Sequence, residues 1–211
     1  MVSRCTAPLV WLFPALAACS AGPPARPAGW WQEQVQAARP AGELDEGPAL
    51  GEGNPGPSVT LSDTATFEVQ WSRATYGFPG WAMHVRANGT ASVISQEVWP
   101  DGAVLRASYR QLEFPLSTVE LAALRQLVRD SGALLLQPVY GRGGEHTWNL
   151  GLRIGDHPRN SHLQGAFPAA ARRLVQGTWD LLVAPRAESF AMAPLLEPRA
   201  VAQRPEYQPL R

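Results

Sequence analysis

The sequence has 211 residues, which is enough for one domain of ordinary size and too short for two full ones. Its 18 basic and 18 acidic residues cancel, and charged residues make up 17% of the chain against 45% hydrophobic residues. This composition excludes a disordered polyampholyte and a polybasic nucleic-acid binder. All 18 basic residues are Arg, so chemistry that requires Lys, such as a Schiff base or a Walker lysine, is excluded as well.

Residues 1–18 are predicted to be a cleaved signal peptide. A positive charge at Arg4 precedes an apolar stretch over residues 7–18. That stretch is too short to cross a bilayer as a helix, which favours an export signal. No run of about 18 apolar residues follows it, so we expect no membrane-spanning segment.

The end of this segment reads Leu16-Ala17-Ala18-Cys19 and resembles the lipobox of bacterial lipoproteins. The resemblance implies that Leu16, Ala17 and Ala18 are signal-recognition residues and that Cys19 is the lipidation site. It also implies a lipid-anchored protein of the bacterial cell envelope, and Ser20 resembles the residue that directs such proteins to the outer membrane. The alternative is an ordinary secretory signal in which Cys19 is incidental.

The chain has two cysteines, Cys5 and Cys19. Cys5 would leave with the signal peptide and Cys19 would carry lipid. The mature protein would then have no disulfide, no thiolate nucleophile and no Cys-ligated metal.

Composition divides the rest of the chain into three parts. Residues 19–60 are rich in Pro and Gly and are predicted to be the lipidated Cys and a flexible tether, with a short helical patch near Trp30. Residues 61–183 carry the periodic patterns of a globular domain. Residues 184–211 form a Pro-rich tail that is either disordered or lies along the domain.

Alternating apolar and polar residues predict the strands of this domain. Phe67, Val69 and Trp71 alternate with polar residues, and so do the apolar residues of 81–85. Asn88-Gly89 is the expected type I′ turn of a hairpin. Further strands are predicted over residues 90–98, 104–114, 134–139, 148–154 and 159–164.

Two helices complete the pattern. Ser117 and Glu120 form a predicted capping box, and Gly132 ends that helix at about Ser131. A second helix is predicted over residues 168–183. The order strands, helix, strands, helix predicts an α+β domain with a mainly antiparallel sheet packed against two helices.

The run from Arg73 to Thr90, followed by Leu116-Ser117 and Glu120, resembles a family of small uncharacterised bacterial envelope domains. Members often carry a Cys pair in the loop that corresponds to residues 76–80, which has no Cys here. The resemblance implies the fold and gives no activity.

The polar residues give no catalytic or metal constellation. The four His do not stand at ligand spacing, and no G-x-S-x-G motif occurs, so we expect no catalytic residue, no metal and no cofactor. The candidate ligand face is the polar side of the sheet, where Asn149 would face His162 across a hairpin. Its residues are His84, Arg86, Asn149, Arg153 and His162.

The leading functional prediction is a lipid-anchored, non-catalytic binding or scaffolding domain whose partner is an envelope protein or a glycan and not a nucleic acid. One alternative is an envelope hydrolase that uses Asp156, His157 and His162. The other is an inhibitor-like module that presents residues 76–80 and Trp81 to a protein partner.

Overall fold

The structure is a computed structural model that describes most of the chain after residue 22. The described residues are 23, 25–40, 51–52, 59–75, 78–101, 104–141, 146–165 and 167–211. The predicted signal peptide, its recognition residues Leu16, Ala17 and Ala18, and Cys19 lie outside the described residues.

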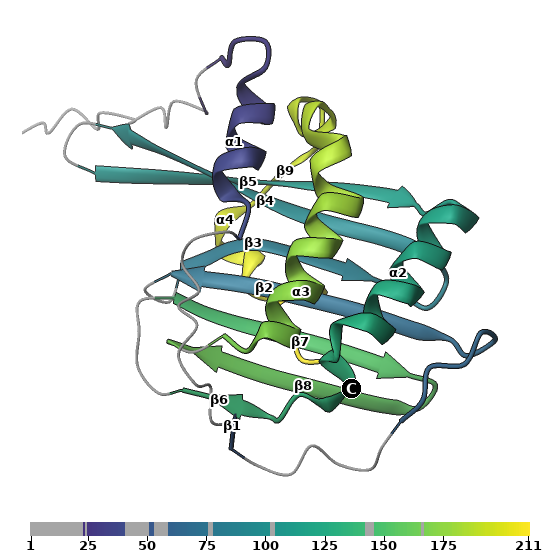
Figure 1. Cartoon of the computed structure of the whole chain (residues 1–211). Helices are drawn as coiled ribbons and strands as arrows, with labels where there is room; N and C mark the ends of the chain where they lie inside the picture. Colours follow the sequence, from purple (N-terminus) through teal and green to yellow (C-terminus); the bar gives the residue numbers. More distant parts are fainter. Residues whose placement is uncertain are drawn as a thin grey trace, which may run out of the picture.

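The described strands form one nine-stranded sheet in the order β1-β6-β8-β7-β2-β3-β4-β5-β9 (Figure 1). All neighbouring strands are antiparallel except β6 and β8, which are parallel. The strands are β1 (Gly51–Glu52), β2 (Phe67–Thr75), β3 (Phe78–Val85), β4 (Thr90–Asp101), β5 (Val104–Pro115), β6 (Val139–Tyr140), β7 (His146–Ile154), β8 (His157–Gln164) and β9 (Leu195–Leu196).

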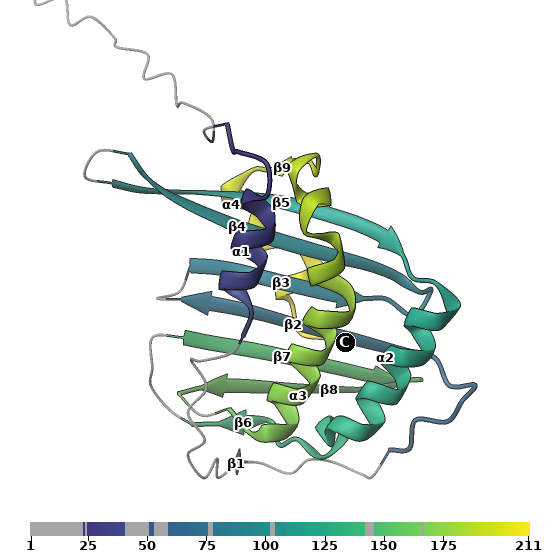
Figure 2. The same cartoon turned by 45° about the horizontal axis from the view of Figure 1, so that its top comes forward.

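Helices lie on both sides of this sheet. The α-helices are α1 (Trp30–Ala38), α2 (Thr118–Ser131), α3 (Ala169–Thr178) and α4 (Pro198–Val201). The other helical segments are η1 (Ala133–Leu135), the π-helical turn η2 (Trp179–Val183), η3 (Ala184–Ala191) and η4 (Pro205–Tyr207). Helices α1, α2 and α3 cover one face, and the C-terminal segment with α4 lies behind the other (Figures 1 and 2). The predicted α+β class with a mainly antiparallel sheet is confirmed, although more than two helices pack on it.

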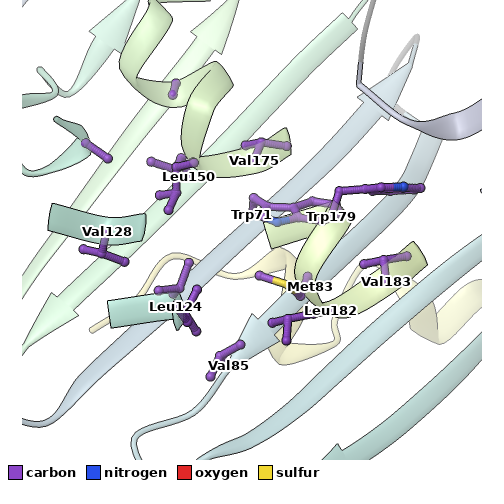
Figure 3. Close-up of a cluster of buried hydrophobic side chains, with 14 of the residues drawn as sticks. Trp71, Met83, Val85, Leu124, Val128, Leu150, Val175, Trp179, Leu182 and Val183 are labelled. Carbon is purple, nitrogen blue, oxygen red and sulfur yellow. The ribbon is translucent and has the colours of Figure 1, made fainter. Parts of the chain in front are cut away.

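The main core lies between the sheet and α1, α2 and α3. The predicted alternation places Phe67, Val69 and Trp71 on this side, and Figure 3 shows Trp71 beside Trp179 of η2. These two rings are stacked with centroids 5.8 Å apart, and the Trp71 Nε1–H donates to Thr178 Oγ1 at 2.9 Å. The buried indole is therefore satisfied, so the ring contributes its full apolar area to the core.

Helix α2 begins and ends where the sequence predicts. Ser117 Oγ accepts a hydrogen bond from the Glu120 N–H at 3.2 Å, and Glu120 Oε2 accepts from the Ser117 N–H at 2.8 Å. Gly132 ends the helix with a φ of 76°, a conformation that favours glycine. The predicted capping box is confirmed.

The turn between β3 and β4 differs from the prediction. The Gly89 N–H donates to the Arg86 carbonyl at 2.9 Å, and the Arg86 N–H donates to the Thr90 carbonyl at 2.9 Å. Gly89 has a φ of 78°. The loop is thus a three-residue turn with glycine in the left-handed position, and the expected two-residue type I′ turn is wrong.

The predicted strand over residues 134–139 is also wrong. Residues 133–135 form η1, Leu135 is 72% exposed, and only Val139 and Tyr140 pair as a strand. Pro138 has no N–H to donate, and its carbonyl accepts from the His162 N–H at 2.7 Å. An apolar run of this length does not distinguish a strand from other buried backbone.

The packed core extends beyond the predicted boundaries of 61 and 183. Trp31 and Val35 of α1 are buried in it, although the predicted tether contains both residues. Phe190 is fully buried from the other side of the boundary, and its ring centroid lies 5.6 Å from that of Trp31. The tail prediction left two alternatives, and in the structure the tail lies along the domain.

Candidate functional site

The second face of the sheet is covered by residues 195–211, which we call the C-terminal strap. Gln70 of β2 holds its centre, because its side-chain Nε2 lies within 2.7–3.0 Å of the carbonyl oxygens of Pro205, Glu206 and Gln208. A side-chain amide of the sheet, rather than another strand, thus donates to the main-chain oxygens of this part of the strap.

The end of the C-terminal strap is held by β7 and β8. The Leu210 N–H donates to Asn160 Oδ1 at 3.0 Å, and Asn160 Nδ2 donates to the Leu210 carbonyl at 2.9 Å. The Leu210 side chain lies against Gly151, where a Cβ atom would come within 3.0 Å of Leu210 Cγ. A side chain at position 151 would therefore require Leu210 to shift by a few tenths of an ångström. Arg153 donates to the carbonyl of Arg211 at 3.0 Å.

Two acidic side chains are buried on this face, and the first is Glu68. It accepts a hydrogen bond from His84 Nε2 at 3.0 Å and another from Arg153. Burial raises the pKa of Glu68, but the hydrogen bonds from Arg153 and His84 outweigh it and leave that pKa below its usual value. Glu68 is therefore ionised at neutral pH.

The second buried acid is Glu206 in the C-terminal strap, whose side chain is fully buried. Its Oε1 accepts from Ser92 Oγ at 2.6 Å and from Gln111 Nε2 at 3.2 Å, and Arg86 lies 3.7 Å away. Its Oε2 makes no hydrogen bond and lies 4.0 Å from Arg204 Nε. Glu206 joins the strap to β4 and β5.

A pocket of about 310 Å³ lies where the C-terminal strap crosses β7 and β8. We call it the amide pocket because side-chain amides dominate its polar lining. Its polar lining residues include Gln70, Asn149, Asn160, His162, Tyr207 and Gln208. Within the described part of the chain, no Asp, Glu or Arg lines this pocket. Gln70 Oε1 is buried and makes no hydrogen bond, so an acceptor is left over beneath the strap.

The structure brings two of the five predicted ligand-face residues into this pocket. Asn149 lies opposite His162 in the register, as predicted, and their Oδ1 and Nδ1 atoms are 2.8 Å apart. His84 is buried against Glu68, so the expectation that it is exposed is wrong. Its polar neighbours and the overlying strap account for that burial.

The two arginines of the predicted ligand face are already paired with acids. Arg86 donates to Glu113 Oε1 at 3.1 Å and lies near Glu206, and Arg153 is paired with Glu68. Their charges are balanced within the protein. Neither of these two arginines is therefore a free cationic site for an anionic ligand.

The sequence did not indicate Gln70, Tyr207 or Gln208 as site residues. Gln70 follows the ordinary alternation of a strand, and the other two residues lie in a Pro-rich segment without periodicity. Burial, with the nearby Tyr109 and Glu206, raises the pKa of the Tyr207 phenol, whose hydroxyl donates to the Gly80 carbonyl. It stays protonated and acts as a donor.

The residues of the hydrolase alternative do not converge. His157 lies opposite Ile154 and His162 opposite Asn149, five positions apart on β8, so the two rings point to opposite faces. Asp156 lies in the turn that precedes β8. The described residues contain no group of three or more His, Cys, Asp or Glu side chains that could hold a metal ion.

The inhibitor-like alternative depends on Trp81, which is buried in the core and packs against Trp179 with centroids 5.0 Å apart. It is not presented at the surface. Tyr76 and Gly77 of the predicted loop lie outside the described residues.

None of the helices in the described residues is long and apolar enough to span a membrane. No family model matches the chain, and no curated protein is similar to it. The functional proposal therefore depends on the N-terminal motif and on the geometry of the amide pocket.

Proposed function

We propose that this protein is a lipid-anchored bacterial envelope protein whose domain binds an uncharged, hydrogen-bonding ligand in the amide pocket and catalyses no reaction. An envelope glycan has that chemistry, because its hydroxyl and acetamido groups both donate and accept hydrogen bonds. The observation that carries the proposal is a pocket lined by side-chain amides and a histidine, in which Asn149 and His162 are exposed.

The size and polarity of the pocket define the ligand. A volume of about 310 Å³ lies at the lower end of the range for small-molecule sites, which suits a single sugar residue. Side-chain amides offer both a donor and an acceptor, so they pair with neutral polar groups at no cost in charge desolvation. The paired arginines on the same face argue against a carboxylate or phosphate ligand.

Anchoring is supported by the lipobox at residues 16–19. Each buried CH₂ of an acyl chain contributes about 0.8 kcal/mol, so the two or three chains on a lipoprotein Cys hold it on a membrane. Feeding cells labelled fatty acid tests this part. We expect label on the wild type and none on Cys19→Ala, and an unlabelled wild type would overturn the anchoring.

Binding is tested with soluble, neutral N-acetylated oligosaccharide fragments and the mature chain, measured by calorimetry. Asn149 is exposed and contacts only His162 in the pocket, so Asn149→Ala should leave the fold intact. Loss of one ligand hydrogen bond predicts about five- to tenfold weaker binding. Gln126→Ala, which removes an exposed amide on α2, is the matched control and should bind like the wild type. Equal binding by Asn149→Ala, or no binding of any neutral fragment, would refute the assigned ligand class.

A further inference from the structure

The N-terminal end of the described chain is fixed to the long β4–β5 hairpin. Arg26 Nε donates to Glu97 Oε1 of β4 at 2.6 Å, and the Arg26 guanidinium lies 4.5 Å from the ring centroid of Trp30. Glu97 is buried, and its second oxygen accepts from Ser108 of β5. Helix α1 follows directly and buries Trp31 in the core. The chain is thus held by the domain at Arg26 and along α1.

This attachment shortens the tether that composition predicts over residues 19–60. Arg26 stands only seven positions after Cys19. Seven residues at about 3.3–3.6 Å each span at most ~25 Å when fully extended. If Cys19 carries the lipid, as the proposed function requires, the β4–β5 hairpin is held within that distance of the membrane surface.

An apolar groove of about 650 Å³ lies at this end of the molecule, between the β4–β5 hairpin and α4. We call it the hairpin groove. Its lining includes the apolar residues Pro79, Val98, Leu105, Ala107 and Pro198 and also two arginines, Arg106 and Arg199. Leu105 is 74% exposed and Val98 is 50% exposed. Val98 is adjacent to Glu97 in β4, so its side chain lies on the opposite face of the hairpin from the side chain that holds Arg26. In Figure 2 the hairpin extends past the neighbouring strands beside the segment that leads into α1.

We propose that the hairpin groove docks onto the phospholipid surface of the membrane that carries the lipid anchor, with Val98 and Leu105 inserted among the lipids. A short attachment keeps the groove at high effective concentration beside that surface, so a few apolar side chains are enough for contact. We assign a lipid rather than a protein as the occupant, because Cys19, the proposed acylation site, stands seven positions before Arg26.

The experiment replaces the natural anchor, so it does not depend on acylation in cells. The mature chain from residue 20 contains no Cys and is attached by an N-terminal His tag to vesicles with nickel-chelating lipid. Leu105→Cys carries an environment-sensitive fluorophore, and Leu135→Cys is the matched control. Leu135 is 72% exposed, against 74% for Leu105, and it lies in η1 near β6, at the other end of the sheet.

We expect a blue shift and a rise in emission at position 105 on phosphatidylcholine vesicles, and no change at position 135. Because the contact is apolar, the change should also persist at high salt. No change at position 105, equal changes at both positions, or a change that requires anionic lipid would overturn the proposal. Fatty-acid labelling of Cys19 in cells separates the anchoring from the docking. If Cys19 is labelled but the fluorophore at position 105 shows no change on vesicles, the docking is refuted and the anchoring stands.

Discussion

The two faces of the sheet are buried in different ways. The face under α1, α2 and α3 is covered by apolar and aromatic side chains such as Trp71 and Trp179. The face under the C-terminal strap buries Glu68, Gln70 and Glu206, each paired with polar groups. Apolar packing supplies stability without strict geometry, whereas buried polar groups must be matched one by one. The second face is accordingly the one whose pocket is bordered by side-chain amides.

The largest effect is expected on the helix-covered face. Trp71→Ala removes a fully buried ring that stacks on Trp179 and donates to Thr178, so it leaves a cavity and removes one buried hydrogen bond. We expect a loss of about 3–5 kcal/mol in the free energy of unfolding, measured in urea. A loss below about 1 kcal/mol would mean that this core is not the main source of stability.

On the strap-covered face, loss of a single buried carboxylate should lower the stability of the protein. Glu206→Ala leaves Ser92, Gln111 and Arg86 without their shared partner and should cost about 2–3 kcal/mol, because those groups stay buried or half-buried. It should also weaken ligand binding, since Tyr207 and Gln208 line the amide pocket. Unchanged binding in a folded Glu206→Ala protein would show that the C-terminal strap does not shape the amide pocket.

A smaller change tests the edge of the helix-covered face. Ser117→Ala removes the cap of α2 but touches no residue of the amide pocket. We expect a loss of about 1 kcal/mol in urea unfolding and unchanged ligand affinity. Ser117→Asp, which also caps a helix, should recover most of that stability; weaker binding by either variant would show that the two faces are coupled.

The smallest effect is expected from a pH-dependent contact between α2 and η3. Arg186 donates to Glu120, and this bond, with those from Ser117, lowers the pKa of Glu120 from 4.5 to about 2. A lowered folded-state pKa stabilises the protein above pH 4.5, and that stability is lost as the pH falls towards 2. The wild type should exceed Glu120→Gln by about 0.5–1 kcal/mol at pH 7, and the difference should vanish near pH 2. A constant difference would contradict the ionised pair.

Local patterns predicted the helix-covered face well. The alternation at Phe67, Val69 and Trp71 and the capping box of Ser117 and Glu120 depend on neighbours in sequence, which a single chain displays directly. The predicted pairing of Asn149 with His162 followed from the same logic, since a two-residue turn fixes the register.

The polar face could be predicted only in part. Gln70 holds carbonyl oxygens of residues more than 130 positions away, and no periodicity marks such a contact. The burial of Trp31 in the core also could not be predicted, because the Pro and Gly residues around it leave no long apolar pattern. Long-range contacts of irregular segments follow from the packed fold, so the amide pocket could not be assembled from the sequence.

The central claim is that the strap-covered face binds the ligand and the helix-covered face builds the fold. Amide chemical-shift mapping of the mature chain during titration with the same neutral oligosaccharide fragments tests it most directly. We expect the shifted amides to gather at Asn149, Asn160, His162 and Gln208, with α2 and α3 unmoved. Shifts centred on α2 and α3, or no shifts at saturating fragment, would contradict the account.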